Sequence, residues 1–187
     1  MFTITETKNI CTFAELSQRA KENVAQKRIA DCFCDDFVDW QQNCISSDLE
    51  CPYNNIDIHF CLANCQGDFV HVFGTFPADK LYAYTHIKND MPDDSPDCLK
   101  GQTITIADSR WYPDITEEVD SFTDDEELQA DIEFRMIESL ELMNKLTQED
   151  GYMLLDDYYY NEDMYEDELF YEDGTFYAYA YDVQQSA

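Results

Sequence analysis

Apolar residues recur at helical spacing in two stretches of the chain. In residues 13–44 the apolar stripe changes face part-way, which predicts two helical pieces, and Thr12 with Glu15 has the spacing of a capping box at their start. The second stretch follows Thr123 and Glu126, which have the same spacing. Its apolar residues lie within an arc of about 120° on a helix with ~100° per residue. They are Leu128, Ile132, Met136, Leu140, Met143 and Leu146.

Alternating apolar and polar residues predict short strands in the rest of the chain. Gly67 with Asp68 indicates the turn of one hairpin, and the run from Glu172 to Gly174 indicates the turn of another. A disordered tail is the alternative for this acidic, tyrosine-rich end. We therefore predict one α+β domain over residues 1–187, with a small antiparallel or mixed sheet and two major helical regions packed on it. The predicted strands are residues 2–6, 56–61, 69–76, 103–107, 169–171 and 176–181.

The chain is strongly acidic, and the charge is unevenly distributed. Asp and Glu number 41 against 11 Lys and Arg among 187 residues, which gives a formal net charge of −30. Residues 1–90 hold 13 acidic and 7 basic side chains, whereas residues 91–187 hold 28 and 4. Such a chain lacks the cations that displace counterions from nucleic-acid phosphates, and an anionic membrane surface repels it. We therefore expect no direct nucleic-acid binding and no membrane binding.

Seven of the eight cysteines lie in the first, mildly acidic half of the chain. No basic segment followed by an apolar run is found near Met1, so we expect reduced thiols and a cytoplasmic location. Cys61 and Cys65, with His59 and His71 nearby, have the chemistry of zinc ligands, and buried apolar cysteine is the alternative. Because we find no glycine-rich phosphate loop, calcium loop or nucleophile signature, we predict a protein that is not an enzyme and has no cofactor.

The acidic residues of the second half are the strongest functional candidates. From Asp114 to the end, 24 acidic residues accompany only Arg135 and Lys145, and about 22 net charges equal those on ~37 Å of duplex DNA. Tyrosine interleaved with the acid suits a protein interface, whereas a solvated helix face is the ordinary alternative. The candidate partner-binding residues are Glu127, Asp131, Glu138, Glu141, Asp156, Asp157, Glu162, Asp163, Glu166, Asp167 and Glu168.

Residues 13–22, FAELSQRAKE, resemble the F-x-E-L-S-x-x-A-K-E start of small bacteriophage-encoded proteins that are often labelled antitoxin-like. In that group a tryptophan-containing helix, a strand ending in a Gly-Asp turn and a late acidic helix follow. The parts of this chain that resemble these features are, in the same order, Trp40, residues 56–60 with Gly67, and residues 140–152. The resemblance implies no catalytic residues. By charge, the chain also resembles DNA-mimic inhibitors, the antirestriction and anti-CRISPR proteins.

These features together predict a phage-encoded, non-enzymatic inhibitor in the host bacterial cytoplasm. It would mimic the charge of DNA and block a basic DNA-binding defence protein of the host, either a restriction or a CRISPR nuclease. An antitoxin-like protein that neutralises a basic toxin is the alternative, and only the mimic must compete with DNA for its partner. The sequence leaves open whether the chain forms a homodimer. The basic residues between positions 19 and 28 are expected to tolerate substitution unless they form a dimer contact.

Overall fold

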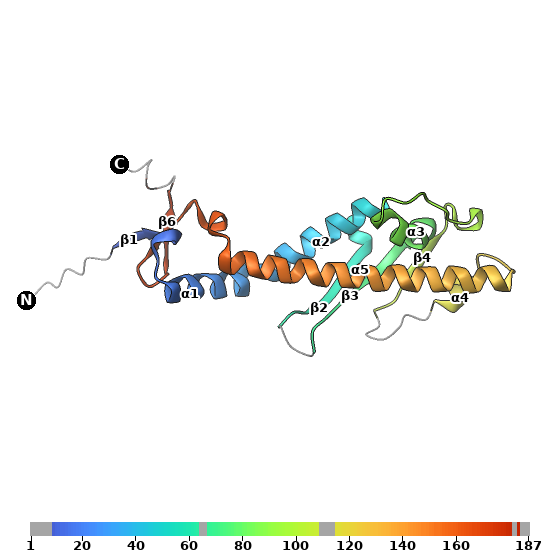
Figure 1. Ribbon diagram of the computed structural model, residues 1–187, viewed down its shortest axis with the longest axis horizontal. Coiled ribbons are helices and arrows are strands. Elements are labelled where there is room, and N and C mark those ends of the chain that lie inside the picture. Colours follow the sequence, from blue (N-terminus) through green and yellow to red (C-terminus); the bar gives the residue numbers. More distant parts are fainter. Residues whose placement is uncertain (1–8, 64–66, 109–114, 181–182, 184–187) are drawn as a thin grey trace, which may run out of the picture. The chain divides into compact units, whose positions relative to one another are not determined.

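The chain is an α+β protein, as predicted, and the computed structural model divides into two compact units (Figure 1). Unit 1 comprises residues 1–36 and 153–187, and unit 2 comprises residues 37–152. The strand predicted at residues 2–6 lies outside the described residues. The structure describes residues 9–63, 67–108, 115–180 and 183.

Unit 1 brings an N-terminal strand and a C-terminal hairpin into one antiparallel sheet of order β1-β5-β6. Strand β1 pairs with β5, so that Cys11 lies opposite Phe170. Strands β5 and β6 form the predicted terminal hairpin, and Gly174 in its turn has a φ of 86°, which favours glycine. The C-terminal segment is therefore folded through the described residues up to Ala180. The strands are β1 (Ile10–Thr12), β5 (Glu168–Tyr171) and β6 (Phe176–Tyr179).

The predicted N-terminal helical region has a more complex start and middle than the sequence pattern indicates. The capping box of Thr12 and Glu15 is present, but it opens a 3-10 turn. Ser17 caps the following helix, because its side chain accepts a hydrogen bond from the backbone N–H of Ala20 at 3.3 Å. The predicted change of face is a π-helical segment. The elements are the 3-10 turn Phe13–Glu15, α1 (Gln18–Arg28), the π-helical segment Ile29–Phe33 and α2 (Cys34–Leu49).

The core of unit 1 forms between its N-terminal and C-terminal parts. Phe13 stacks on Tyr165 with ring centroids 4.1 Å apart, and Phe170 packs edge-on against Phe13 at 6.2 Å. Tyr165 comes from a 3-10 turn, Glu162–Tyr165, that precedes the terminal hairpin. Apolar burial between segments far apart in the sequence therefore holds this unit together.

Unit 2 contains a second antiparallel sheet, of order β2-β3-β4, where the sequence predicted a single sheet. The predicted β2–β3 hairpin is confirmed, with His59 opposite His71, and β4 extends it as the third strand. Two helices, α3 and α4, were not predicted. The elements are β2 (Ile56–Cys61), β3 (Phe69–Pro77), α3 (Ala78–Lys88), β4 (Thr103–Ile106) and α4 (Thr116–Asp120), with 3-10 turns at Tyr53–Asn55 and Asp97–Leu99.

Gly74 allows β3 to pass close to the start of β2. Its φ is 137°, and a Cβ atom built there would lie 2.0 Å from the carbonyl oxygen of Asn55. Any side chain at this position would displace the backbone of the neighbouring strand. The hairpin register that places Ile56 opposite Gly74 therefore depends on glycine.

The long helix α5 (Glu126–Tyr160) carries the predicted apolar stripe. Ile132, Met136 and Met143 on this stripe have no exposed surface. Asn144 connects the helix to the sheet, because its Oδ1 accepts a hydrogen bond from the backbone N–H of Val72 in β3 at 2.8 Å. The stripe therefore faces the core of unit 2, as its spacing predicts.

Both ends of α5 differ from the sequence prediction. The capping box predicted at Thr123 is wrong, because Asp125 caps the helix instead. Its Oδ1 accepts hydrogen bonds from the backbone N–H groups of Glu127 and Leu128 at 3.1 and 3.3 Å. The helix also continues to Tyr160, through residues that the sequence placed in an acidic tail.

Candidate partner-binding surface

One face of α5 carries four of the predicted partner-binding carboxylates in unit 2. Glu127, Asp131, Glu138 and Glu141 are all exposed. Helical steps of four, seven and three residues return the chain to one side of the helix, so these four lie opposite the buried stripe. We call these four residues the acidic face.

One carboxylate of the acidic face, that of Asp131, is held in place by a residue of α3. The hydroxyl of Tyr82 in α3 donates a hydrogen bond to Oδ2 of Asp131 at 2.7 Å. Burial of the ring, together with this hydrogen bond and the charge of Asp131, raises the pKa of Tyr82 to about 12. Tyr82 therefore stays protonated and keeps donating to Asp131 at neutral pH.

The loop after α3 places more acid beside the acidic face. Arg135 of α5 donates from Nη2 to Oδ1 of Asp94 at 2.9 Å, and Nδ1 of His86 lies 3.0 Å from the same oxygen. The Arg135 guanidinium also lies 4.8 Å from the ring centroid of Tyr82. This cation holds the loop of residues 90–97 next to the helix. The other acidic residues of the loop are exposed and are Asp90, Asp93 and Asp97.

An aromatic side chain that the charge analysis missed lies within the acidic face. Phe134 falls between Asp131 and Glu138 on the exposed side of α5, and 64% of its surface is accessible. Its position breaks the apolar periodicity of the helix, which is the sequence signal that identifies it. A large exposed aromatic ring among charges is typical of a residue that anchors a protein interface.

The charge density of α5 alone is below that of DNA. At ~1.5 Å per residue, the acidic face from Glu127 to Glu141 spans about 21 Å. Four charges over that length give roughly one per 5 Å, whereas duplex DNA carries one per ~1.7 Å. The helix therefore needs the neighbouring acidic loop, and the exposed acid at its own start, to approach the charge density of a duplex. The exposed acidic residues at and just before this start are Asp120 at the end of α4, Asp124, Asp125 and Glu126.

The remaining predicted carboxylates belong to unit 1, and their environments differ. Asp156, Asp157, Asp163, Glu166 and Asp167 are exposed on the end of α5, the 3-10 turn and the approach to β5. Two others form ion pairs with α1, Glu162 with Lys21 and Glu168 with Arg28. Glu168 is 9% exposed, so it does not belong to a free acidic surface as the sequence analysis expected.

The basic residues of α1 have a structural role that the sequence analysis did not assign. Lys21 and Arg28 connect α1 to the C-terminal part of unit 1 through Glu162 and Glu168. The expectation that the whole basic group tolerates substitution stays a prediction for Lys21, whose pair is exposed, whereas we expect Arg28 to be an exception because Glu168 is buried. Arg19 and Lys27 are exposed and have no ion pair with any described residue.

The histidines of the β2–β3 hairpin share one carboxylate. Nδ1 of His59 lies 3.0 Å from Oδ2 of Asp108, and Nδ1 of His71 lies 3.3 Å from Oδ1. Cys61 is exposed, and Cys65 lies outside the described residues, so the zinc hypothesis for this pair remains a hypothesis. Within the described ranges, no group of three or more His, Cys, Asp or Glu is arranged to hold a metal ion.

Comparisons of the chain with protein-family models, with curated proteins and with solved structures gave no match. Among the described residues, no helix is long and apolar enough to span a membrane.

Salt should stabilise this chain. A formal net charge of −30 means that repulsion between carboxylates opposes folding, and added salt screens this repulsion more than it weakens a few surface ion pairs. We expect the melting temperature to rise between low and physiological NaCl, by roughly 2–4 °C for each kcal/mol of repulsion removed. Thermal unfolding followed by circular dichroism measures this rise.

The control for this prediction compares sodium with magnesium at equal ionic strength. Equal effects of the two salts indicate screening, whereas a larger effect of magnesium indicates ion binding to the carboxylates. A flat or falling melting temperature in NaCl would contradict the prediction.

Proposed function

We propose that this chain is a phage-encoded, non-enzymatic inhibitor that presents DNA-like charge to a basic DNA-binding protein of host defence. The observation that carries the proposal is the acidic face, which combines exposed carboxylates with the exposed ring of Phe134 on a helix anchored in the core of unit 2. Carboxylates fixed on a packed helix lose little conformational freedom on binding, and they attract a basic groove over a long range.

Mimicry requires acid at more than one place, and the chain supplies it. Unit 2 adds the loop of residues 90–97 and the start of α5 to the acidic face. Unit 1 adds exposed carboxylates between residues 156 and 167, without a basic residue in the last 35 positions. A solubility role needs only a small net charge, so it does not account for this concentration in one half of the chain.

Neutralising the acidic face tests the proposal. The variant combines Glu127→Gln, Asp131→Asn, Glu138→Gln and Glu141→Gln, and we expect it to associate with its basic partner at least about tenfold more slowly at low salt. The partner is recovered from host lysate on immobilised chain, eluted with salt and purified. Surface plasmon resonance over a range of salt concentrations then measures the association rate.

The matched control removes four exposed carboxylates from other elements of the chain. It combines Glu22→Gln, Asp35→Asn, Asp39→Asn and Asp57→Asn, which lie on α1, α2 and β2. Because the two variants have the same net charge, a slower association shared by both would mean that only total charge matters, and α5 would lose its role. If duplex DNA fails to compete for the partner, mimicry is excluded and neutralisation of a basic toxin becomes the better account.

Phe134 provides a separate prediction about the same face. An aromatic side chain that becomes buried in the complex affects the dissociation rate more than the association rate, because its contacts form only after the two proteins have met. We expect Phe134→Ala to raise the dissociation rate by about tenfold or more, which corresponds to ~1.4 kcal/mol, and to leave the salt dependence of association unchanged. Met153→Ala is the control, because Met153 is equally exposed at 63% on the same helix but belongs to unit 1. An unchanged dissociation rate for Phe134→Ala would contradict this prediction.

A further inference from the structure

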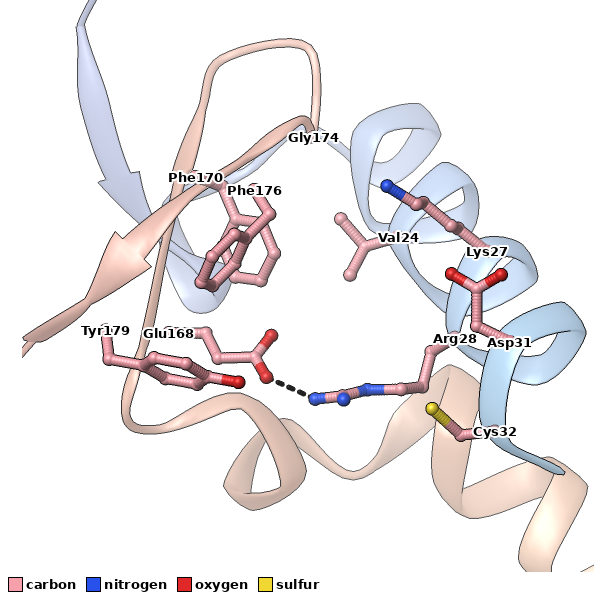
Figure 2. A pocket seen from close by; sticks show the side chains of 10 residues that line it. All are labelled: Val24, Lys27, Arg28, Asp31, Cys32, Glu168, Phe170, Gly174, Phe176 and Tyr179. Atoms are coloured by element: carbon pink, nitrogen blue, oxygen red, sulfur yellow. Dashed lines mark hydrogen bonds and ion pairs between the residues drawn. The ribbon is translucent and has the colours of Figure 1, made fainter. Parts of the chain in front are cut away.

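Unit 1 contains a cavity of about 200 Å³ between the N-terminal helical region and the terminal hairpin (Figure 2). Its volume suits one side chain or a small molecule rather than a folded element. The hydrophobic side is formed by Val24 and Phe170. The charged and aromatic residues that line it are Lys27, Arg28, Asp31, Glu168, Phe176 and Tyr179.

The π-helical segment Ile29–Phe33 forms one wall of this cavity. Asp31 and Cys32 of the segment line the cavity together with Arg28, the last residue of α1 (Figure 2). A π-helical turn is wider than an α-helical turn, is rare and often occurs at functional sites. The wider turn of this segment therefore changes the direction of side chains that line the cavity.

Glu168 presents an unused acceptor to the cavity. It is 9% exposed, and its Oε1 accepts from Nη2 of Arg28. Figure 2 shows its second oxygen directed toward the open centre of the cavity. No hydrogen bond to this Oε2 is formed by the residues that the structure describes. This oxygen faces the open cavity and has acceptor capacity, so a ligand that donates hydrogen bonds would fit here.

The surroundings of the cavity favour a cation. Phe176 and Tyr179 line it with partly exposed aromatic rings, at 41% and 38%, and the face of such a ring attracts positive charge. Asp31 adds an exposed carboxylate that has no ion pair within the described ranges. Lys27 and Arg28 balance Asp31 and Glu168 in the lining itself, but unit 1 as a whole holds 16 acidic and 5 basic residues, so the wider field is negative.

We infer that this cavity binds the guanidinium group of an arginine side chain supplied by a protein partner. A guanidinium is planar, so it can lie against the rings of Phe176 and Tyr179 while its N–H groups reach Oε2 of Glu168 and the carboxylate of Asp31. A lysine ammonium offers neither the flat face nor the fork of donors. That the partner is a basic protein rests on the proposed function, whereas the chemistry of the cavity does not.

Lys27 makes the sign of the ligand charge testable. Lys27 is an exposed lining residue whose positive charge repels a cationic ligand, whereas it would attract an anionic one. We expect Lys27→Gln to tighten arginine binding by roughly twofold to fivefold at low salt. Weaker binding in this variant would mean that the cavity recognises an anion and would overturn the inference.

The binding experiment uses the full chain and N-acetyl-arginine amide as the probe, followed by amide chemical shifts in an NMR titration. We expect saturable shifts confined to the residues that line the cavity. N-acetyl-lysine amide should bind several-fold more weakly, and the uncharged isostere N-acetyl-citrulline amide should not produce saturable shifts. Saturable binding of citrulline, or no saturable shifts with arginine, would overturn the inference.

Two pairs of variants separate the cavity from general attraction by acid. Asp31→Asn should weaken arginine binding several-fold, whereas Asp35→Asn, an exposed carboxylate one turn later, should not. Tyr179→Leu should weaken it similarly, whereas Tyr177→Leu should not, because Tyr177 is as exposed, at 40%, but does not line the cavity. Equal effects within either pair would contradict a specific site.

A last arm distinguishes a partner's arginine from a free polyamine. Putrescine binding as tightly as the arginine probe would assign a small-amine site and overturn the role of a partner. The purified partner should also lose affinity for Tyr179→Leu but not for Tyr177→Leu. Failure of duplex DNA to compete for the partner would remove the proposed mimicry and leave the arginine site standing. Competition by DNA without any arginine binding would support the proposed mimicry and overturn the arginine site.

Discussion

Raising the pH from 10 to 12 is expected to unfold this chain, because both units bury tyrosines whose phenol groups are held in the neutral form. In unit 2, burial raises the pKa of Tyr84 above its usual range, and the nearby carboxylates of Asp48 and Asp150 add to the effect. Tyr82, which is 4% exposed, has its pKa raised to about 12.

Unit 1 contains a second pair of such tyrosines. Burial raises the pKa of Tyr165 to about 12, and its hydroxyl donates to the backbone carbonyl of Tyr158 at 2.7 Å. Burial and a hydrogen bond of 2.6 Å to Asp36 raise the pKa of Tyr158 as well. An ionised phenol at either position would lose its hydrogen bond and place a negative charge in an apolar core.

The direction of the pH dependence follows from these raised pKa values. Below pH 10 the phenols are neutral in both the folded and the unfolded chain, so their contribution to stability is complete. Above pH 10 the unfolded chain releases the protons first, and stability is lost as the pH rises through about 12. A rise of two pKa units corresponds to ~2.7 kcal/mol, so Tyr82 and Tyr165 together contribute several kcal/mol.

Two signals followed in one titration measure this effect. Phenolate absorbance should show exposed tyrosines ionising near pH 10 and a later group that ionises together with the loss of helical circular dichroism. Tyr82→Phe, which removes one ionisable group, should move the unfolding of unit 2 to higher pH. Titration of all the tyrosines near pH 10 with the helices intact would contradict the prediction.

The elements that the sequence predicted well are those with one buried face. The stripe of α5 was predicted because Ile132, Met136 and Met143 lie on its buried side and charged residues lie on the other. The two hairpins were predicted because alternating strands flank a turn that contains glycine and aspartate. In each case the pattern along the chain directly reports which side of the element meets water.

Helix α3 was missed because it has no such pattern. Leu81, Tyr82, Ala83 and Tyr84 are consecutive and all buried, so this part of the helix shows no polar face from which a period could be read. The π-helical segment was visible only as a change of face, since nothing in composition distinguishes it from a break between two helices. The cap of α5 was misplaced by two residues because Thr123 and Asp125 are both good capping residues.

The candidate site was predictable only in part for a related reason. Exposure of the acidic face follows from helical periodicity, so the sequence identified it. The environment of Glu168 depends on Arg28, which lies 140 positions away in the chain. Among many acidic residues, sequence alone offers no way to tell which one the fold turns inward. For the same reason, the cavity beside this ion pair could not be predicted from the sequence.

Removing one member of the Arg28–Glu168 pair is expected to destabilise unit 1 strongly. The Glu168 side chain is 11% exposed and that of Arg28 is 31% exposed, so loss of either leaves the other charge poorly solvated. Loss of one partner of a fully buried pair costs ~3–5 kcal/mol. Because Arg28 keeps some contact with water, we expect Arg28→Met or Glu168→Leu to cost about 2–3 kcal/mol.

A double-mutant cycle distinguishes the ion pair from simple loss of packing. The double variant of Arg28→Met and Glu168→Leu leaves no unpaired charge, so it should be at least about 1 kcal/mol more stable than the two single effects would sum to. Hydrogen exchange of the backbone amides in β5 reports on unit 1, and exchange in β3 reports on unit 2.

The Lys21–Glu162 pair is the internal control for this cycle. Glu162 has a side chain that is 52% exposed, so Lys21→Met or Glu162→Gln should cost less than about 1 kcal/mol. Strictly additive effects of Arg28→Met and Glu168→Leu would show that the two side chains act independently. In that case the carboxylate of Glu168 would not depend on Arg28 for its charge balance, and its Oε2 would no longer be a reason to expect a cation in the adjoining cavity.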